Sequence, residues 1–233
     1  MNLPDSVWRW LLGGMVLLVS SWLSADEGNA DEKALLTDLF PSKCHFSGQF
    51  TQTKAVAGLP VPLKSNGDFF FSCDLGLIWR THEPFNEAIL YVNSTNNFRV
   101  NEDGSLASLT GVTRYIMSNV FVKLLKGDAA YFIDEFAISQ ADDDASITLT
   151  PQSDFMKKGI QHIRFNKSES EDLGITLFVD VMDATGQATH VSIDTIVHYD
   201  IEGKRRAFEQ CEKLYSQHTD WCQVLRSPSR VRQ

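Results

Sequence analysis

The chain has 233 residues, of which 43% are hydrophobic, enough for a packed core and too many for a disordered chain. Its formal net charge of −9 excludes nucleic acid as a partner and directs any lipid contact to apolar surface, because acidic proteins are repelled by phosphates and anionic headgroups. With 15 Phe against five Trp and five Tyr, a large core or an apolar cavity should be rich in phenylalanine.

Residues 1–25 are predicted to be a signal peptide that exports the chain to the periplasm. Arg9 precedes an apolar run over 10–23, and small residues close the run at Ala25. Cleavage is expected after Ala25, with Ala30 as the alternative. A retained membrane anchor is the other interpretation, although the run is shorter than the roughly 20 residues that a span needs.

Four cysteines in an exported chain favour disulfides over free thiols, which remain the alternative. Cys44 and Cys73 flank a predicted hairpin whose loop lies midway between them, so antiparallel pairing places them opposite each other. Cys211 and Cys222 lie in a predicted helical tail, where one straight helix would separate them by about 16 Å. We therefore predict Cys44–Cys73 and Cys211–Cys222, the second with a helix break over 216–220.

The first half of the chain changes from helical to alternating hydrophobicity. Residues 31–40 are predicted as a short amphipathic helix that Pro41 ends. Residues 55–65 hold glycine and prolines and are predicted as a loop, and Asp103-Gly104 is a hairpin signal. Alternation then predicts five strands, at 46–51, 68–73, 77–81, 87–93 and 97–101.

The second half opens with apolar residues at helical spacing over 113–125, followed by Gly127 as a stop signal. A helix is predicted over 206–225, and residues 226–233 as a frayed tail, so that 26–225 form one domain. An antiparallel sheet of this length should curl, with helices over one face. Five more strands are predicted between the two helices, at 131–139, 146–150, 159–166, 173–183 and 188–199.

Three stretches resemble the periplasmic outer-membrane lipoprotein carrier (LolA-like) family, as a divergent branch. The strand over 46–54, Phe-Ser-Gly-Gln-Phe-Thr-Gln-Thr-Lys, is similar to the family's F-x-x-x-F-x-Q. Residues 65–71, Leu77-Ile-Trp79 and then Pro84 are similar to its G-x-L/F…L/F-x-W-x-x-x-x-P pattern. The third stretch is the apolar helix over 116–125 with the strand that ends at Leu149-Thr-Pro151.

The resemblance implies a mainly β (α+β) fold, an unclosed antiparallel β-barrel or strongly curved sheet with a helical lid over an apolar cavity. It implies a carrier that binds the acyl chains of lipoproteins or other lipids and passes them from an inner-membrane donor toward an outer-membrane acceptor, and a monomer is expected. The family's lipoprotein carriers have an arginine that ties the lid at the position of Cys73. With Cys73 in a disulfide, control of the lid must work differently.

The candidate site follows from the side of each strand that should face the cavity, and a Cys44–Cys73 bond requires both cysteines on that side. The lipid-binding residues would be Phe46, Phe50, Phe69, Phe71, Leu77, Trp79, Ile89 and Tyr91. The facing lid residues would be Ile116, Met117, Val120, Phe121 and Leu124. The same side chains could instead fill an ordinary core, which would make the chain a non-transporting envelope module with the same fold.

Signals of catalysis or metal binding are weak. The six histidines are scattered without H-E-x-x-H spacing, and the cysteines lack C-x-x-C spacing. Asp142 to Asp144 reads as a solvated turn, because the alternation and terminal Glu of an EF-hand loop are missing. Lys204 to Arg206 reads as a solvated basic face. No catalytic residue, metal site or cofactor is therefore predicted.

Overall fold

The computed structural model describes residues 24–39, 43–93, 96–109, 112–140, 146–170 and 174–230, without the side chains of 24–31, 112–118 and 230. The strands are β1 (His45–Lys54), β2 (Leu63–Ser72), β3 (Gly76–Glu83), β4 (Glu87–Tyr91), β5 (Asn97–Val100), β6 (Leu106–Ser108), β7 (Phe136–Gln140), β8 (Ile147–Pro151), β9 (Ile160–Ser170), β10 (Gly174–Asp183) and β11 (Ala188–His198). The helices are α1 (Ser24–Leu39), α2 (Val112–Lys126), α3 (Ala129–Glu135), α4 (Asp154–Lys157), α5 (Gly203–Leu214), α6 (Thr219–Arg226) and the 3₁₀ helix η1 (Pro228–Arg230).

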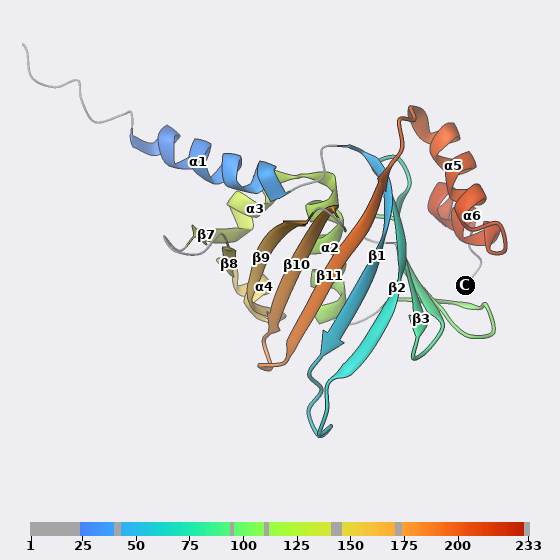
Figure 1. The fold of residues 1–233 in the computed structure, drawn as a ribbon, viewed down its shortest axis with the longest axis horizontal. Coiled ribbons are helices and arrows are strands. Elements are labelled where there is room, and N and C mark those ends of the chain that lie inside the picture. Colours follow the sequence, from blue (N-terminus) through green and yellow to red (C-terminus); the bar gives the residue numbers. More distant parts are fainter. Residues whose placement is uncertain are drawn as a thin grey trace, which may run out of the picture.

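One eleven-stranded sheet runs through the molecule in the order β6-β5-β4-β3-β2-β1-β11-β10-β9-β8-β7, with antiparallel neighbours (Figure 1). Strands β6 and β7 stand at the two edges and do not pair, so the sheet remains open. This confirms the mainly β, unclosed architecture. The signal peptide predicted over 1–25 lies almost wholly outside the described residues, as do Pro41, the turn at 142–144 and the last three residues of the tail.

Two irregularities help the sheet to bend. Between β1 and β11 the register shifts from Ser47 to Gln49, where β11 carries an extra residue and Thr195 has a φ of 52°. Such a bulge increases the local twist. Between β2 and β3 the register shifts at Gly67, where a Cβ would lie 1.8 Å from the Arg80 carbonyl oxygen. Only glycine allows the two strands to approach this closely.

Helix α3 occupies the first half of the segment 131–139, so the strand predicted there is wrong up to residue 135. The Asp128 carboxylate caps the helix by accepting a hydrogen bond from the Tyr131 backbone N–H at 3.2 Å. The helix also buries Phe132 completely, with its ring centroid 5.8 Å from that of Phe136. A capped helical turn therefore buries the aromatic residues whose spacing suggested a strand.

Both faces of the sheet are covered, whereas the sequence predicted helices over one face only. The inner face carries Phe69 and Phe71 and packs in one cluster with residues of α1, α2, α3 and α4. The outer face carries Phe70, which packs in a second cluster with α5 and α6. Figure 1 shows α2 and the α5–α6 pair on opposite sides of β1–β3. Successive phenylalanines point to opposite sides of a strand, so β2 needs cover on both faces.

The C-terminal segment predicted as helical over 206–225, with a break over 216–220, is a hairpin of two helices. The chain turns at residues 215–218, so the break that the Cys211–Cys222 bond requires is confirmed. No helix in the described part of the chain is both long and apolar enough to cross a bilayer.

Candidate functional site

The residues selected from strand alternation share the inner face, because the register places them opposite one another. Phe46 pairs with Phe71, and Phe71 in turn pairs with Leu77. Leu77 continues to Tyr91, so one row of inner-face side chains crosses four strands. The neighbouring row joins Phe69, Trp79 and Ile89, with Phe50 opposite Gly67 beside it.

These side chains are covered by other protein atoms. Phe46, Phe71 and Leu77 are 0% exposed, Phe69 is 1% and Phe50 is 2% exposed. A side chain that borders a water-sized void keeps accessible surface, so no such void adjoins Phe46, Phe71 or Leu77. The inner face is therefore packed around these three residues. Trp79 and Tyr91 are half-buried against the same cluster, and Ile89, although in register with Trp79, is half-buried outside it.

Helix α2 provides part of the cover, as predicted for a lid. Val120 and Leu124 are each 2% exposed and belong to the inner cluster. The Trp79 ring stacks on Phe50 at a centroid distance of 3.8 Å and meets Phe121 of α2 at 5.7 Å. The side chains of Ile116 and Met117, also predicted for the lid, lie outside the described residues.

Sequence reasoning did not include the residues that fill the rest of the space. Leu36 and Leu39 come from α1, and Phe132 comes from α3, all buried in the inner cluster. The apolar face of the helix predicted over 31–40 was a signal for the first two. No comparable signal was available for Phe132, because its segment reads as a strand.

The joint between α2 and α3 is short and polar. Gly127 ends α2 with a φ of 67°, and the next residue, Asp128, caps α3. The Lys123 ammonium lies 2.6 Å from the Asp128 carboxylate, and this hydrogen bond lowers the pKa of that carboxyl against the opposing effect of burial. The Lys123 and Asp128 side chains keep about a third of their surface exposed, so this ion pair stabilises the joint only weakly.

Both predicted disulfides are present. Cys44 and Cys73 have Cα atoms 5.2 Å apart, and the Cys73 backbone N–H donates to the Cys44 carbonyl at 3.0 Å. This bond closes the β1–β2 hairpin at the end remote from its loop. Cys211 and Cys222, with Cα atoms 5.9 Å apart, join α5 to α6.

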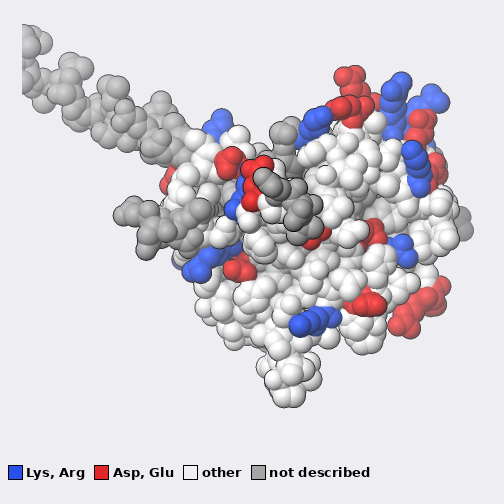
Figure 2. Space-filling view, in the orientation of Figure 1, with Lys and Arg blue, Asp and Glu red and all other residues white. Residues whose placement is uncertain are grey.

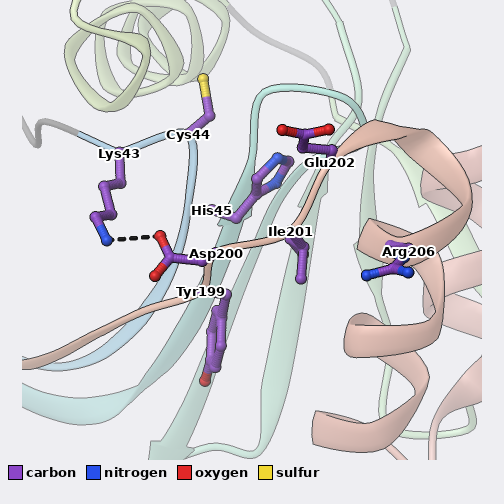
Figure 3. Close-up of a pocket in the computed structure, with 8 residues that line it drawn as sticks. All are labelled: Lys43, Cys44, His45, Tyr199, Asp200, Ile201, Glu202 and Arg206. Carbon is purple, nitrogen blue, oxygen red and sulfur yellow. Dashed lines mark hydrogen bonds and ion pairs between the residues drawn. The ribbon is translucent and has the colours of Figure 1, made fainter.

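A polar pocket of about 580 Å³ lies where β11 leads into α5. Figure 3 shows Lys43 and Asp200 facing each other across the strand ends, 2.6 Å apart, with Arg206 on α5 set apart from them. The hydrogen bond from Lys43 lowers the pKa of the exposed Asp200 carboxyl. The charges balance, which gives a charged ligand little net attraction. The lining residues are Lys43, Cys44, His45, Tyr199, Asp200, Ile201, Glu202 and Arg206.

A second polar group on the outer face was also missed by sequence reasoning. Asp68 on β2 accepts a hydrogen bond from the Tyr215 hydroxyl at 2.7 Å, and its other carboxylate oxygen lies 2.6 Å from His82 Nε2. Burial raises the pKa of Tyr215 well above its usual value, and the Asp68 charge raises it further. A protonated phenol that donates to a carboxylate is suited to holding the helical hairpin on the sheet.

Residues 43–208 match the family model described as outer membrane lipoprotein carrier protein LolA. A solved LolA superfamily protein from Nitrosomonas europaea has a TM-score of 0.45 and 11% identity, covering 75% of this chain and 94% of its own. A DUF1329 family protein from Desulfovibrio piger has a TM-score of 0.45 and 9% identity, covering 76% and 94%. None of the curated proteins matches. Because the model match spans most of the sequence, the chain belongs to the LolA family of outer membrane lipoprotein carrier proteins.

Proposed function

We propose that this protein is a periplasmic, non-enzymatic carrier that binds acyl chains of lipoproteins or other lipids between its inner face and α2. It would take cargo from an inner-membrane donor and pass it toward an outer-membrane acceptor. The single observation that carries the proposal is the register of the inner face, where aromatic and aliphatic side chains line up across β1, β2, β3 and β4. Membership of the LolA family supports it.

Binding requires α2 to move away, because the inner face is packed around Phe46, Phe71 and Leu77. Lifting Phe121 from Trp79 costs about 1 kcal/mol for the ring contact, and exposing the buried Val120 and Leu124 of α2 costs about 1.5–3 kcal/mol for each. An acyl chain recovers about 0.8 kcal/mol for each methylene that it buries. Roughly five to nine buried methylenes thus offset these losses, and a long acyl chain has more to contribute.

The α2–α3 joint suits such a movement. Gly127 adopts backbone angles that other residues rarely reach. The partly exposed Lys123 bridges the joint through its ion pair with Asp128, and its ammonium also lies 5.2 Å from the centre of the Tyr131 ring. Helix α3 remains anchored by the fully buried Phe132. Opening α2 would therefore leave the α1–α3 packing in place.

One observation favours a second candidate, a non-transporting envelope module of the same fold. Phe46, Phe71 and Leu77 retain no exposed surface, as in an ordinary packed core. The two candidates differ in whether the inner face ever admits an alkyl chain.

Native mass spectrometry of protein taken directly from the periplasm tests the proposal, together with titration of a fluorescent fatty acid. We expect co-purifying acyl lipid and saturable probe binding. Phe121→Asp should lower the affinity for the probe by at least about tenfold, since a charge would lie in the apolar binding space. Leu106→Asp is the matched control, half-buried against the outer cluster, and should bind as wild type. If the protein carried no acyl lipid and did not bind the probe, the carrier proposal would be wrong and the envelope module would be the remaining function.

A further inference from the structure

An unusual apolar surface protrudes at the loop end of the β1–β2 hairpin, away from the inner-face cluster. We call residues 55–63, Ala-Val-Ala-Gly-Leu-Pro-Val-Pro-Leu, the β1–β2 tip. Leu59 is 53% exposed, Val61 is 68% and Leu63 is 39% exposed. In the adjacent β3–β4 turn Phe85 is 61% exposed. Figures 1 and 2 show the hairpin loop extending beyond the body of the molecule as an uncharged projection.

The charges around the tip are arranged in layers. The chain contains 30 Asp and Glu residues, yet none lies in 55–63, and the tip is bounded by Lys54 and Lys64. The strand register brings these lysines to adjacent rungs, since Lys54 pairs with Leu63 and Lys64 with Thr53. Asp183 near Lys54 offsets part of this charge. An apolar projection with ammonium groups at its base matches the order of a bilayer, acyl chains inside and anionic phosphates outside.

The tip is also preorganised. Pro60 and Pro62 each restrict the backbone, and Leu59 donates a backbone hydrogen bond to Val56 at 3.1 Å. A Cβ added at Gly58 would meet nothing within 4 Å, which shows how far the turn stands from the body of the protein. A stiff, convex apolar projection loses little conformational entropy on insertion, and a fluid bilayer accepts a convex shape without a matching pocket.

We propose that the β1–β2 tip inserts its leucines and valine into the interface of a phospholipid bilayer that contains anionic headgroups. The acidic chain as a whole would be repelled by such a surface, so the uncharged tip, flanked by Lys54 and Lys64, is the part that can approach it. The inference goes beyond cargo binding, because the tip residues lie outside the inner cluster. The inference identifies the β1–β2 tip as the surface through which the protein docks on a membrane.

Cosedimentation of the purified protein with phosphatidylethanolamine–phosphatidylglycerol vesicles tests this inference. Val61→Asp should lower the partition coefficient about tenfold or more, since a charge replaces an inserted aliphatic group. Val197→Asp is the matched control. Val197 is also exposed (48%), but it lies at the end of β11 that is remote from the β1–β2 tip. Replacing Lys54 and Lys64 by Gln should weaken binding to these vesicles several-fold and leave binding to pure phosphatidylcholine vesicles unchanged.

A tryptophan placed at the tip reports insertion directly. Leu59→Trp fluorescence should shift to the blue on vesicle addition and be quenched by brominated acyl chains. Equal partitioning of the Val61→Asp and Val197→Asp proteins, or no vesicle binding by the wild type, would overturn the inference, and the tip would then be assigned to a protein partner. Fatty-acid probe binding is measured without vesicles, so failure of membrane docking and failure of the carrier function are separate results.

Discussion

Apolar packing covers both faces of the sheet, but the two covers differ in the polar and covalent bonds that accompany it. On the inner face, α2 is held by apolar contacts such as Phe121 with Trp79, and the joint that follows it carries one partly exposed ion pair. On the outer face, the α5–α6 hairpin is closed by the Cys211–Cys222 bond and held to β2 by the Tyr215–Asp68 hydrogen bond. Apolar contacts can be exchanged for an alkyl chain, whereas a crosslinked hairpin is suited to permanent cover.

The outer cover is also where the chain extends past its family. The family match ends at residue 208, within α5, before either cysteine of the hairpin. Arg226 lies over the Phe208 ring at 4.6 Å, and His218 stacks on Trp221 at 4.1 Å. These contacts hold the two helices of the hairpin together. Trp221, Val224 and Leu225 are buried in one cluster with apolar outer-face residues of β2–β5 that would otherwise meet water.

Phe70 and Phe71 give the sharpest test of this comparison, because they are adjacent, both 0% exposed and on opposite faces. We expect Phe70→Ala and Phe71→Ala each to lower the free energy of unfolding by about 3–5 kcal/mol in urea denaturation. Only Phe71→Ala should also change affinity for the fatty-acid probe. Similar probe affinities for the two variants would break the division between a binding face and a structural face.

Removing the crosslink of the outer cover should have a somewhat smaller effect. The double variant Cys211→Ser/Cys222→Ser should lose about 2–4 kcal/mol of stability, since the unfolded chain regains the freedom of an open loop. Probe affinity should remain that of the wild type. The matched variant Cys44→Ser/Cys73→Ser frees the end of the β1–β2 hairpin, and Cys73 packs against the inner cluster. This variant should therefore alter both stability and probe binding. If both double variants lost stability but kept the probe affinity of the wild type, the comparison would be contradicted.

The smallest expected effect concerns pH. The folded pKa of Tyr215 is raised, so its contribution to stability is complete below the unfolded pKa of about 10 and is lost as pH rises beyond it. Tyr215→Phe should cost about 1–3 kcal/mol at pH 7, where Asp68 Oδ1 loses the donor that the Tyr215 hydroxyl provides. Above pH 10 this variant should lose less stability than the wild type does. Parallel alkaline profiles for the two proteins would show that this hydrogen bond does not hold the hairpin.

Much of the fold could be predicted because its signals are local. The alternation in 46–51 and 68–73 depends only on which side chains a strand turns inward, and the structure places strands there. The hairpin between these strands was enough to bring Cys44 opposite Cys73. The segment 131–139 failed because one carboxylate, Asp128, favours a capped helix that alternation does not reveal.

The sequence by itself determined most of the strand pattern, the two disulfides and the inner-face row of Phe46, Phe71 and Leu77, since chain periodicity controls these features. Only the tertiary structure decided that Leu36, Leu39 and Phe132 pack into the inner cluster, because they come from segments that are remote or read differently along the chain. It also decided that the outer face is covered, through contacts between β2 and Tyr215 across 147 residues. Packing between distant segments depends on three-dimensional closeness, which hydrophobic periodicity does not encode.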